Sequence, residues 1–290
     1  NLLSSDSDRF QYLKFWECLH PLDNKLLGPL QAHLLNSTAD YIDPCLKTVH
    51  YVEANGAEEC IFPMRFSNLS ILNSFTWNIP TYNKYLLNKI NQEKIKFMYQ
   101  EHKTFLQLLQ YKNQSSKKQW ILKSPGHTGM LDTLYEIFPD AIIITTHRHP
   151  IDIVGSYISL AAFVRSHMIS SLGNYNEFAK EMIDALQIGM KSLIKFYHQY
   201  DNNTKLIIDI SYEKLIKYPI DTIKYIYKAC NEQVDQKCVT KMKKHIKNNK
   251  QHKYGKHIYN ISDYGIKNKD VDIIFNEYIQ FLIKEKIIKK

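Results

Sequence analysis

Residues 120–157 read WILKSPGHTGMLDTLYEIFPDAIIITTHRHPIDIVGSY, and this stretch decides the fold class. The order strand, polar turn and helix occurs twice, which predicts neighbouring parallel strands joined by helices. In such sheets a ligand binds outside the carboxyl ends of the strands, where both polar turns fall. The pattern therefore predicts an α/β fold, a parallel β-sheet flanked by helices, with a binding site at the two turns.

The first turn carries a cation and a titratable base. Lys123 follows the first apolar strand, where a compact positive charge can neutralise an oxyanion on a leaving group. His127 lies four positions later, and imidazole can take a proton from an attacking hydroxyl near neutral pH. A lone histidine is more often structural, but the neighbouring lysine favours a functional interpretation.

The second turn carries a candidate anion site. Arg148 directly follows the apolar run 140–146, and its guanidinium can make forked contacts with phosphate beside the next helix N-terminus. Ser156, about two turns into that helix, could donate its hydroxyl to the same anion. The alternative is an arginine that pairs with a core carboxylate and a serine that only packs. The combination favours anion binding.

A metal site is considered and rejected at this turn. His147 and His149 flank Arg148, but no third ligand lies near them in the sequence, so no metal site is predicted. The GxSxG, HExxH and GxxxxGK[ST] motifs are absent from the chain, which argues against common hydrolase plans and against an ordinary phosphate-binding loop.

Hydrophobic periodicity extends the secondary-structure prediction to the rest of the chain. Residues 1–115 are predicted to be mainly helical, with helices at residues 24–35 and 85–111. Strands are predicted at residues 119–122, 140–146 and 205–210, the second of them buried on both faces. Further helices are predicted at residues 130–137, 151–160 and 177–200.

Composition bounds the classes of function. The net charge of +9 comes largely from residues 237–256, which could attract nucleic acid, a membrane surface or a charged nucleotide, or form a solvated Lys-rich helix face. Few aromatics interleave with these lysines, so nucleic acid is not the expected partner. Five cysteines without a CxxC pair predict reduced thiols. No apolar run approaches the roughly 20 residues of a membrane span, and no signal peptide is visible.

The motifs WILKSPGH, FPDA and HRHP, with Ser156 after them, resemble the sulfotransferases that use 3′-phosphoadenosine-5′-phosphosulfate (PAPS). The most similar branch has W-x-LKSPxH, then FPDA, then HRDP followed by a serine. More distant segments agree, at residues 15–21, 58–60, 211–219 and 257–266. The resemblance implies a sulfotransferase fold of the P-loop-nucleotide-hydrolase type, organised as one domain over residues 1–290.

The resemblance also implies how a nucleotide is held. Arg148 and Ser156 are expected to bind the 3′-phosphate of PAPS, and Tyr212 is expected to lie against the adenine. Lys253 and Lys256 match the family's late basic nucleotide contact in placement. Residues 1–115 become the acceptor side, and residues 116–290 become the nucleotide-binding core with C-terminal helices.

The implied reaction moves a sulfuryl group from PAPS to a hydroxyl of a small-molecule or carbohydrate acceptor, without a metal. His127 is then the general base, and Lys123 stabilises charge near the transferred group. The acidic pair Glu58–Glu59 falls in residues 51–81, a segment that is either an acceptor pocket or lid, or a plain loop. Two alternatives stay open: a catalytically inactive sulfotransferase-like binding protein, and a basic nucleic-acid-binding protein.

Two departures from the family pattern matter. His149 stands where the family has the aspartate of HRDP, which alters the local orientation rather than the arginine contact. The family's first strand and its phosphosulfate-binding loop, roughly RSGTT, have no counterpart before Asn1. The expectation is a truncated sequence that binds PAPS poorly or not at all by itself. A cytoplasmic location is predicted, or the Golgi lumen if a missing N-terminus carries an anchor; the oligomeric state is not predicted.

Overall fold

The computed structural model describes residues 2–88, 91–115, 117–168, 172–200, 207–250, 253–255 and 258–288. The chain divides into two compact units, each built from three separate segments. The first unit comprises Asn1–Ser70, Met98–Ser124 and Val234–Ile258. The second comprises Ile71–Phe97, Pro125–Gln233 and Tyr259–Lys290. Neither unit follows the predicted boundary near residue 115, and organisation as one domain remains a prediction.

The first unit contains a short parallel pair of strands. Strand β1 (Phe10–Tyr12) pairs with β2 (Gln119–Ile121), in the register Phe10↔Gln119 to Tyr12↔Ile121. Lys123 therefore follows a strand that is paired inside this unit. The helical elements are η1 (Leu3–Ser5), α1 (Phe15–Leu19), α2 (Leu27–Ile42), α3 (Leu46–Val49), α4 (Ile61–Met64), η2 (Arg65–Ser67), α13 (Gln236–Asn248) and most of α7 (Gln92–Asn113).

A small aromatic core holds the first unit together. Phe15 and Trp16 are buried with Ala32, so α1 packs directly on α2. Gly28 faces the Trp16 ring so closely that an added Cβ would occupy the space of the ring. The absence of a side chain at this position is therefore what lets the two helices meet.

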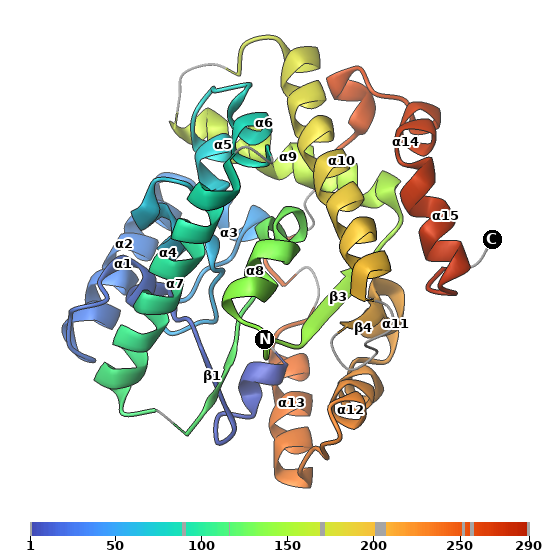
Figure 1. Cartoon of the computed structure of the whole chain (residues 1–290). Helices are drawn as coiled ribbons and strands as arrows, with labels where there is room; N and C mark the ends of the chain where they lie inside the picture. Colours follow the sequence, from blue (N-terminus) through green and yellow to red (C-terminus); the bar gives the residue numbers. More distant parts are fainter. Residues whose placement is uncertain are drawn as a thin grey trace. The chain divides into compact units, whose positions relative to one another are not determined.

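The second unit contains the other parallel pair. Strand β3 (Ile143–His147) pairs with β4 (Ile207–Ser211), and His147 lies opposite Ser211 at the carboxyl ends (Figure 1). The helical elements are α5 (Leu72–Thr76), α6 (Tyr82–Leu86), η4 (Pro125–Gly129), α8 (Leu131–Ile137), α9 (Pro150–Met168), α10 (Tyr175–Tyr200), α11 (Tyr212–Lys217), α12 (Pro219–Ala229), η5 (Ile261–Tyr264), α14 (Asn268–Ile274) and α15 (Asn276–Lys284).

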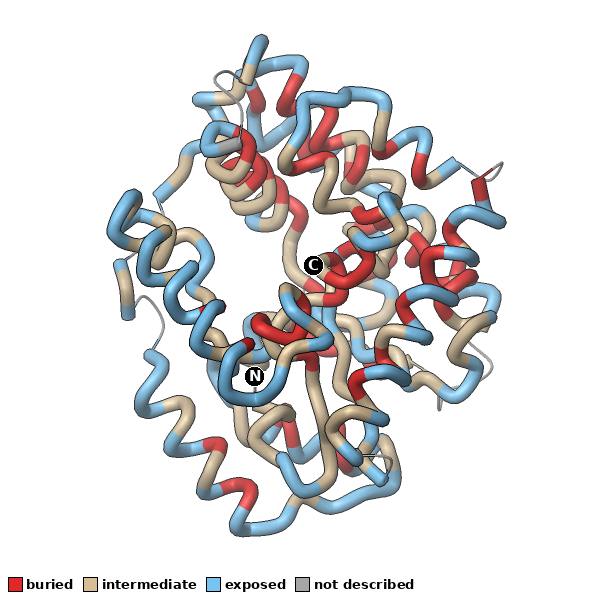
Figure 2. Tube along the Cα trace, turned by 90° about the vertical axis from the view of Figure 1, so that its left-hand side faces the viewer, coloured by how far each residue is buried: buried red, intermediate tan, exposed pale blue. Residues whose placement is uncertain are grey.

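Helices α9 and α10 form the centre of this unit. Along α10, buried and exposed positions recur at helical spacing, which is the sign of an amphipathic helix, whereas the residues of α9 from Ile153 to Arg165 are all buried or partly buried. Figure 2 shows how far each described residue is buried along the Cα trace. A fully buried ion pair crosses between them: Arg165 Nη1 lies 3.0 Å from Glu181 Oε2, and Nη2 lies 3.2 Å from Oε1. The guanidinium also lies over the Phe178 ring, 4.6 Å from its centroid, and donates to the Ser74 carbonyl. One arginine thus ties α5, α9 and α10 together.

Most predicted elements are confirmed, with shifted ends. The parallel α/β fold is correct, and the predicted long helix at residues 85–111 begins later, at Gln92 of α7, after the separate helix α6. Residues 205 and 206 of the third predicted strand lie outside the described part of the chain; the rest is β4. Strand β1 was not predicted, because three residues show no usable periodicity.

The prediction that residues 140–146 form a strand buried on both faces is wrong. Strand β3 begins at Ile143, and its residues alternate between partly buried and exposed until the buried His147. Ile142 is 46% exposed and Ile144 is 37% exposed. Only one face of this strand is packed, so its alternate side chains reach solvent although all of them are apolar or β-branched.

Candidate functional site

Arg148 lies at the carboxyl end of β3, as predicted. Its guanidinium carbon is 4.9 Å from the centroid of the Tyr212 ring, the first residue of α11 after β4. Its Nε lies 3.3 Å from Asp152 Oδ2, an ion pair one helical turn along, and the arginine side chain is 33% exposed. The guanidinium is thus oriented by an aromatic face and a carboxylate, while the side chain as a whole stays partly exposed to solvent.

Ser156 continues the same side of α9. It follows Asp152 by four positions, so both residues lie on one face of the helix, and Ser156 is partly buried. Gly155 beside it packs under Tyr259, where an added Cβ would lie 2.6 Å from a ring carbon. The late segment that starts at Tyr259 therefore braces α9 at the predicted serine.

His149 occupies the position of the family's aspartate and precedes the helix. Its carbonyl accepts from the Asp152 amide at 3.0 Å, and its Nδ1 lies 3.4 Å from the Ile151 amide. The ring therefore does at the start of α9 what an aspartate does as an N-cap. The helix N-terminus next to Arg148 adds partial positive charge where the guanidinium already attracts anions.

His127 lies in η4, in the second unit. The turn packs on α10, and Gly129 lies so close to Leu87 that an added Cβ would be 2.9 Å from a leucine methyl carbon. His127 is partly buried, and desolvation by the surrounding chain lowers its pKa from 6.5 to about 4. The imidazole is consequently neutral at physiological pH, the form in which it can accept a proton.

Lys123 belongs to the first unit and has a partner there. Its ammonium is paired with Glu59 Oε1, and its carbonyl accepts from the Cys60 amide at 2.9 Å. Desolvation lowers the pKa of Lys123, and the charge of Glu58 opposes this effect. The lysine side chain is 69% exposed, so the paired ammonium is also open to solvent.

The late basic segment is described in part. Lys253 is exposed, and its ammonium lies 5.0 Å from the Tyr254 ring centroid. Tyr254 stacks on Tyr51 at 4.3 Å, and the Thr48 hydroxyl donates to the Tyr254 carbonyl at 2.7 Å, so the segment is anchored within the first unit. Lys256, the other predicted contact, lies outside the described residues.

The most basic helix of the first unit is α13. Helix α13 buries Cys238, Val239 and Met242, and its lysines at 237, 243, 244 and 247 are exposed. In the part of the chain that the structure covers, no group of His, Cys, Asp or Glu side chains could hold a metal ion. None of the described helices is long and apolar enough to cross a bilayer.

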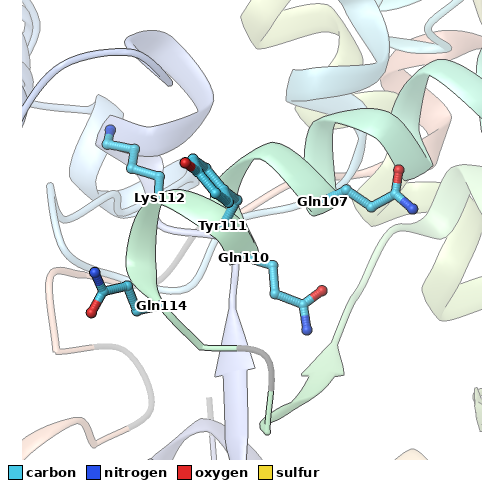
Figure 3. Close-up of a pocket in the computed structure, with 5 residues that line it drawn as sticks. All are labelled: Gln107, Gln110, Tyr111, Lys112 and Gln114. Atoms are coloured by element: carbon cyan, nitrogen blue, oxygen red, sulfur yellow. The ribbon is translucent and has the colours of Figure 1, made fainter.

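A shallow surface recess lies at the end of α7, and none of the candidate residues lines it. Its side chains come from the last turns of the helix and the residue after it (Figure 3). Glutamines dominate the lining, with no cation except Lys112, whose ammonium donates to the Pro21 carbonyl at 2.7 Å. The recess therefore offers no candidate for anion binding or proton transfer.

Two of the predicted nucleotide residues meet directly, Arg148 and Tyr212, and Ser156 lies further along α9, on the same face as Asp152. Lys123 and Lys253 belong to the first unit and are each described there. Sequence reasoning missed Asp152 as the partner of Arg148. The signal was present, because an Arg and an Asp four positions apart at a helix start commonly pair.

Comparison with known proteins identifies the family and the fold of the chain. The profile described as Sulfotransferase family matches residues 1–236, which is most of the chain. The chain belongs to the sulfotransferase family. No curated protein sequence matches it significantly.

Two solved sulfotransferases share the fold. The crystal structure of sulfotransferase STF9 from Mycobacterium avium has a TM-score of 0.82 and 22% identity, over 97% of this chain and 72% of that one. The crystal structure of sulfotransferase STF1 from Mycobacterium tuberculosis H37Rv has a TM-score of 0.77 and 23% identity, over 95% of this chain and 72% of that one. At these identities the comparison shows the fold.

Proposed function

We propose that this sulfotransferase uses PAPS and transfers its sulfuryl group to a hydroxyl of a small-molecule or carbohydrate acceptor. The observation that carries the proposal is the Arg148–Tyr212 pair, with 4.9 Å between guanidinium carbon and ring centroid, at the carboxyl ends of two paired parallel strands. This edge of a parallel sheet is where α/β folds bind nucleotides. A guanidinium on an aromatic face suits a phosphorylated adenosine.

The donor set fits such a nucleotide. Arg148 and Ser156 would hold the 3′-phosphate, with the N-terminus of α9 adding favourable charge. Tyr212 would offer its ring to the adenine. Lys253 and Lys256 would give the late basic contact. PAPS would supply the activated sulfuryl group, and adenosine 3′,5′-bisphosphate would leave with the electron pair of the broken sulfur–oxygen bond on its 5′-phosphate.

The reaction needs one proton acceptor and one source of positive charge. His127, neutral at physiological pH because its pKa is lowered to about 4, would take the proton of the acceptor hydroxyl as that oxygen forms its bond to sulfur. The bond from sulfur to the 5′-phosphate oxygen breaks, with entering and leaving oxygens in line, as in phosphoryl transfer. Lys123 would stabilise the negative charge near the transferred sulfuryl group. To do so, its ammonium would leave its present partner, Glu59.

Binding calorimetry with adenosine 3′,5′-bisphosphate and adenosine 5′-monophosphate tests the proposal. The protein should prefer the bisphosphate. Arg148→Ala should weaken bisphosphate binding by about 1.5–3 kcal/mol, the scale of a hydrogen bond to a charged group, and leave the monophosphate nearly unchanged. Equal affinity of the native protein for both nucleotides, or an unaltered bisphosphate affinity in the variant, contradicts the nucleotide site.

Transfer itself is tested with radiolabelled PAPS and a panel of phenols, alcohols and sugars. A labelled product whose formation requires Arg148 supports the enzyme. Tight nucleotide binding without transfer to any acceptor favours the catalytically inactive alternative.

A further inference from the structure

Three polar side chains from three elements meet behind the carboxyl ends of β3 and β4. His147, the last residue of β3, is 1% exposed. Its Nδ1 lies 2.8 Å from the Tyr278 hydroxyl on α15, and its Nε2 lies 2.7 Å from Asp209 Oδ1 on β4. Tyr278 is 4% exposed, and the Asp209 side chain is 17% exposed. None of the three residues has a role in the reaction described above.

In this cluster, the donor or acceptor role of each group depends on the roles of the other two. Burial raises the pKa of Tyr278, with the charge of Asp209 adding to the effect, so the phenol keeps its proton. A phenol O–H can therefore donate to Nδ1, which leaves the proton of a neutral imidazole on Nε2, where it faces the Asp209 carboxylate. Both ring nitrogens are then satisfied. Removal of any one partner leaves a buried polar atom unpaired, which is costly in a protein interior.

The cluster lies directly next to the two residues of the nucleotide site. His147 immediately precedes Arg148, and its register partner Ser211 immediately precedes Tyr212. The same two strand ends are thus linked twice: by the hydrogen bonds of the His147 imidazole, and by the contact of the Arg148 guanidinium with the Tyr212 ring. Strand β3 pairs only with β4 among the described residues. The side-chain hydrogen bonds of His147 therefore fix the end of β3 beyond what the backbone hydrogen bonds of this one strand pair can do.

We propose that His147, Asp209 and Tyr278 form a positioning network that presets Arg148 for the ribose 3′-phosphate of an adenine nucleotide. The inference rests on the proposed function, since it assumes that Arg148 meets that phosphate. The network contacts the neighbouring strand and α15 rather than the nucleotide. Its effect therefore concerns the selectivity for the 3′-phosphate, because only that group depends on where the guanidinium points.

The measurement is the ratio of two dissociation constants, adenosine 5′-monophosphate over adenosine 3′,5′-bisphosphate, by calorimetry well below the melting temperature. Tyr278→Phe should lower this ratio by about 5- to 10-fold, the size of coupling between residues of one network. His147→Phe should do the same. His147→Gln should keep most of the ratio, because its amide can donate to Asp209 and accept from Tyr278.

A matched control comes from the same unit. Tyr197 on α10 donates its hydroxyl to Glu285 at 3.3 Å and belongs to another contact of α15. Tyr197→Phe should leave the ratio unchanged. Melting curves of all variants show how much stability each substitution removes, and the milder Tyr278→Phe and His147→Gln keep the test available if His147→Phe does not fold.

The possible results distinguish a failure of the positioning network from a failure of the proposed nucleotide site. An unchanged ratio in Tyr278→Phe and His147→Phe overturns the network while a bisphosphate preference lost in Arg148→Ala still supports the nucleotide site. Equal weakening of both nucleotides also overturns it, since that is the result of a purely structural role. Absence of any bisphosphate preference in the native protein rejects the proposed function and the network with it.

Discussion

Two ion pairs, one in each unit, show opposite ways of holding a charge. Lys123 and Glu59 pair in the first unit, where the lysine side chain is 69% exposed and the glutamate side chain is 12% exposed. Arg165 and Glu181 pair inside the second unit, where the side chains are 0% and 4% exposed. The first pair can exchange with solvent and ligands at little cost. The second cannot open without leaving an uncompensated charge in the core.

The surroundings of Arg148 and of Lys123, the proposed nucleotide and transfer contacts, differ in the same way. Arg148 is braced by a ring, a carboxylate and a strand end whose last residue is buried. Lys123 has one carboxylate partner and extensive exposure. We therefore expect the proposed nucleotide contact to be rigid before binding, and the proposed transfer contact to change its partner on binding.

The largest effect is expected at the buried pair. Glu181→Gln should lower the free energy of unfolding by about 3–5 kcal/mol, because Arg165 is left as an unpaired buried charge. Urea denaturation measures this change, provided the dependence on urea concentration is the same in both proteins. A loss below about 1 kcal/mol would contradict this expectation, because it would mean that the unpaired Arg165 costs no more than the loss of a surface ion pair.

The next largest effect concerns turnover. His127→Ala should lower kcat by roughly 10²-fold or more, the usual contribution of a general base. His198→Ala is the matched control, because it removes an exposed imidazole from α10 of the same unit. Near-normal turnover of His127→Ala removes this residue from the mechanism and leaves Arg148 and Tyr212 as binding residues only.

The pH dependence sharpens the same assignment. A folded pKa of about 4 keeps His127 neutral down to mildly acidic pH. The acid limb of kcat/KM should therefore fall near pH 4 to 5 rather than near the ordinary histidine value of about 6.5. A limb centred near pH 6.5 contradicts a desolvated base.

The lowered pKa also has a consequence for stability. The unfolded chain binds a proton at His127 below its ordinary value, about 6.5, whereas the folded chain does so only near 4. The contribution of this group is thus fully present above pH 6.5 and is lost progressively as the pH falls toward 4. In His127→Gln this part of the pH dependence should disappear, as followed by urea denaturation at several pH values.

The smallest effect is expected at the exposed pair. Glu59→Gln should change the free energy of unfolding by less than about 1 kcal/mol, as is typical of surface ion pairs. Loss of several kcal/mol would show that the first unit depends on this pair and would remove the contrast with Arg165 and Glu181. Circular dichroism melting and urea denaturation give the comparison.

The two regions also differ in how well the sequence predicted them. The end of β3 and the start of α9 were predicted from a local signal, a β-branched run followed by Arg148 and the helix-starting Pro150. The position of Lys123 after β2 was equally local. Its partner Glu59 lies 64 positions away and was noted only as part of an acidic pair in a possible pocket or loop.

Burial was the least predictable property. The run 140–146 is uniformly apolar or β-branched after Asp140, so its composition gives no alternation to show which face is exposed. The structure shows an exposed Ile144 between partly buried neighbours. Conversely, His147 is a polar residue by type and one of the most buried positions of the strand. Helix α15 and strand β4 pack on His147 and bury it, and no pattern of neighbouring residues in the sequence indicates this packing.

Secondary structure, the parallel α/β class and the place of Arg148 at a strand end follow from residues within a few positions of one another. Such features depend on backbone geometry and hydrophobic period, which neighbours in the chain set. The partners of these residues are a different matter. Asp209 and Tyr278 reach His147 across 62 and 131 positions, and Tyr212 reaches Arg148 from the adjacent strand. Strand register and helix packing select such contacts from many, so the folded chain alone decides them.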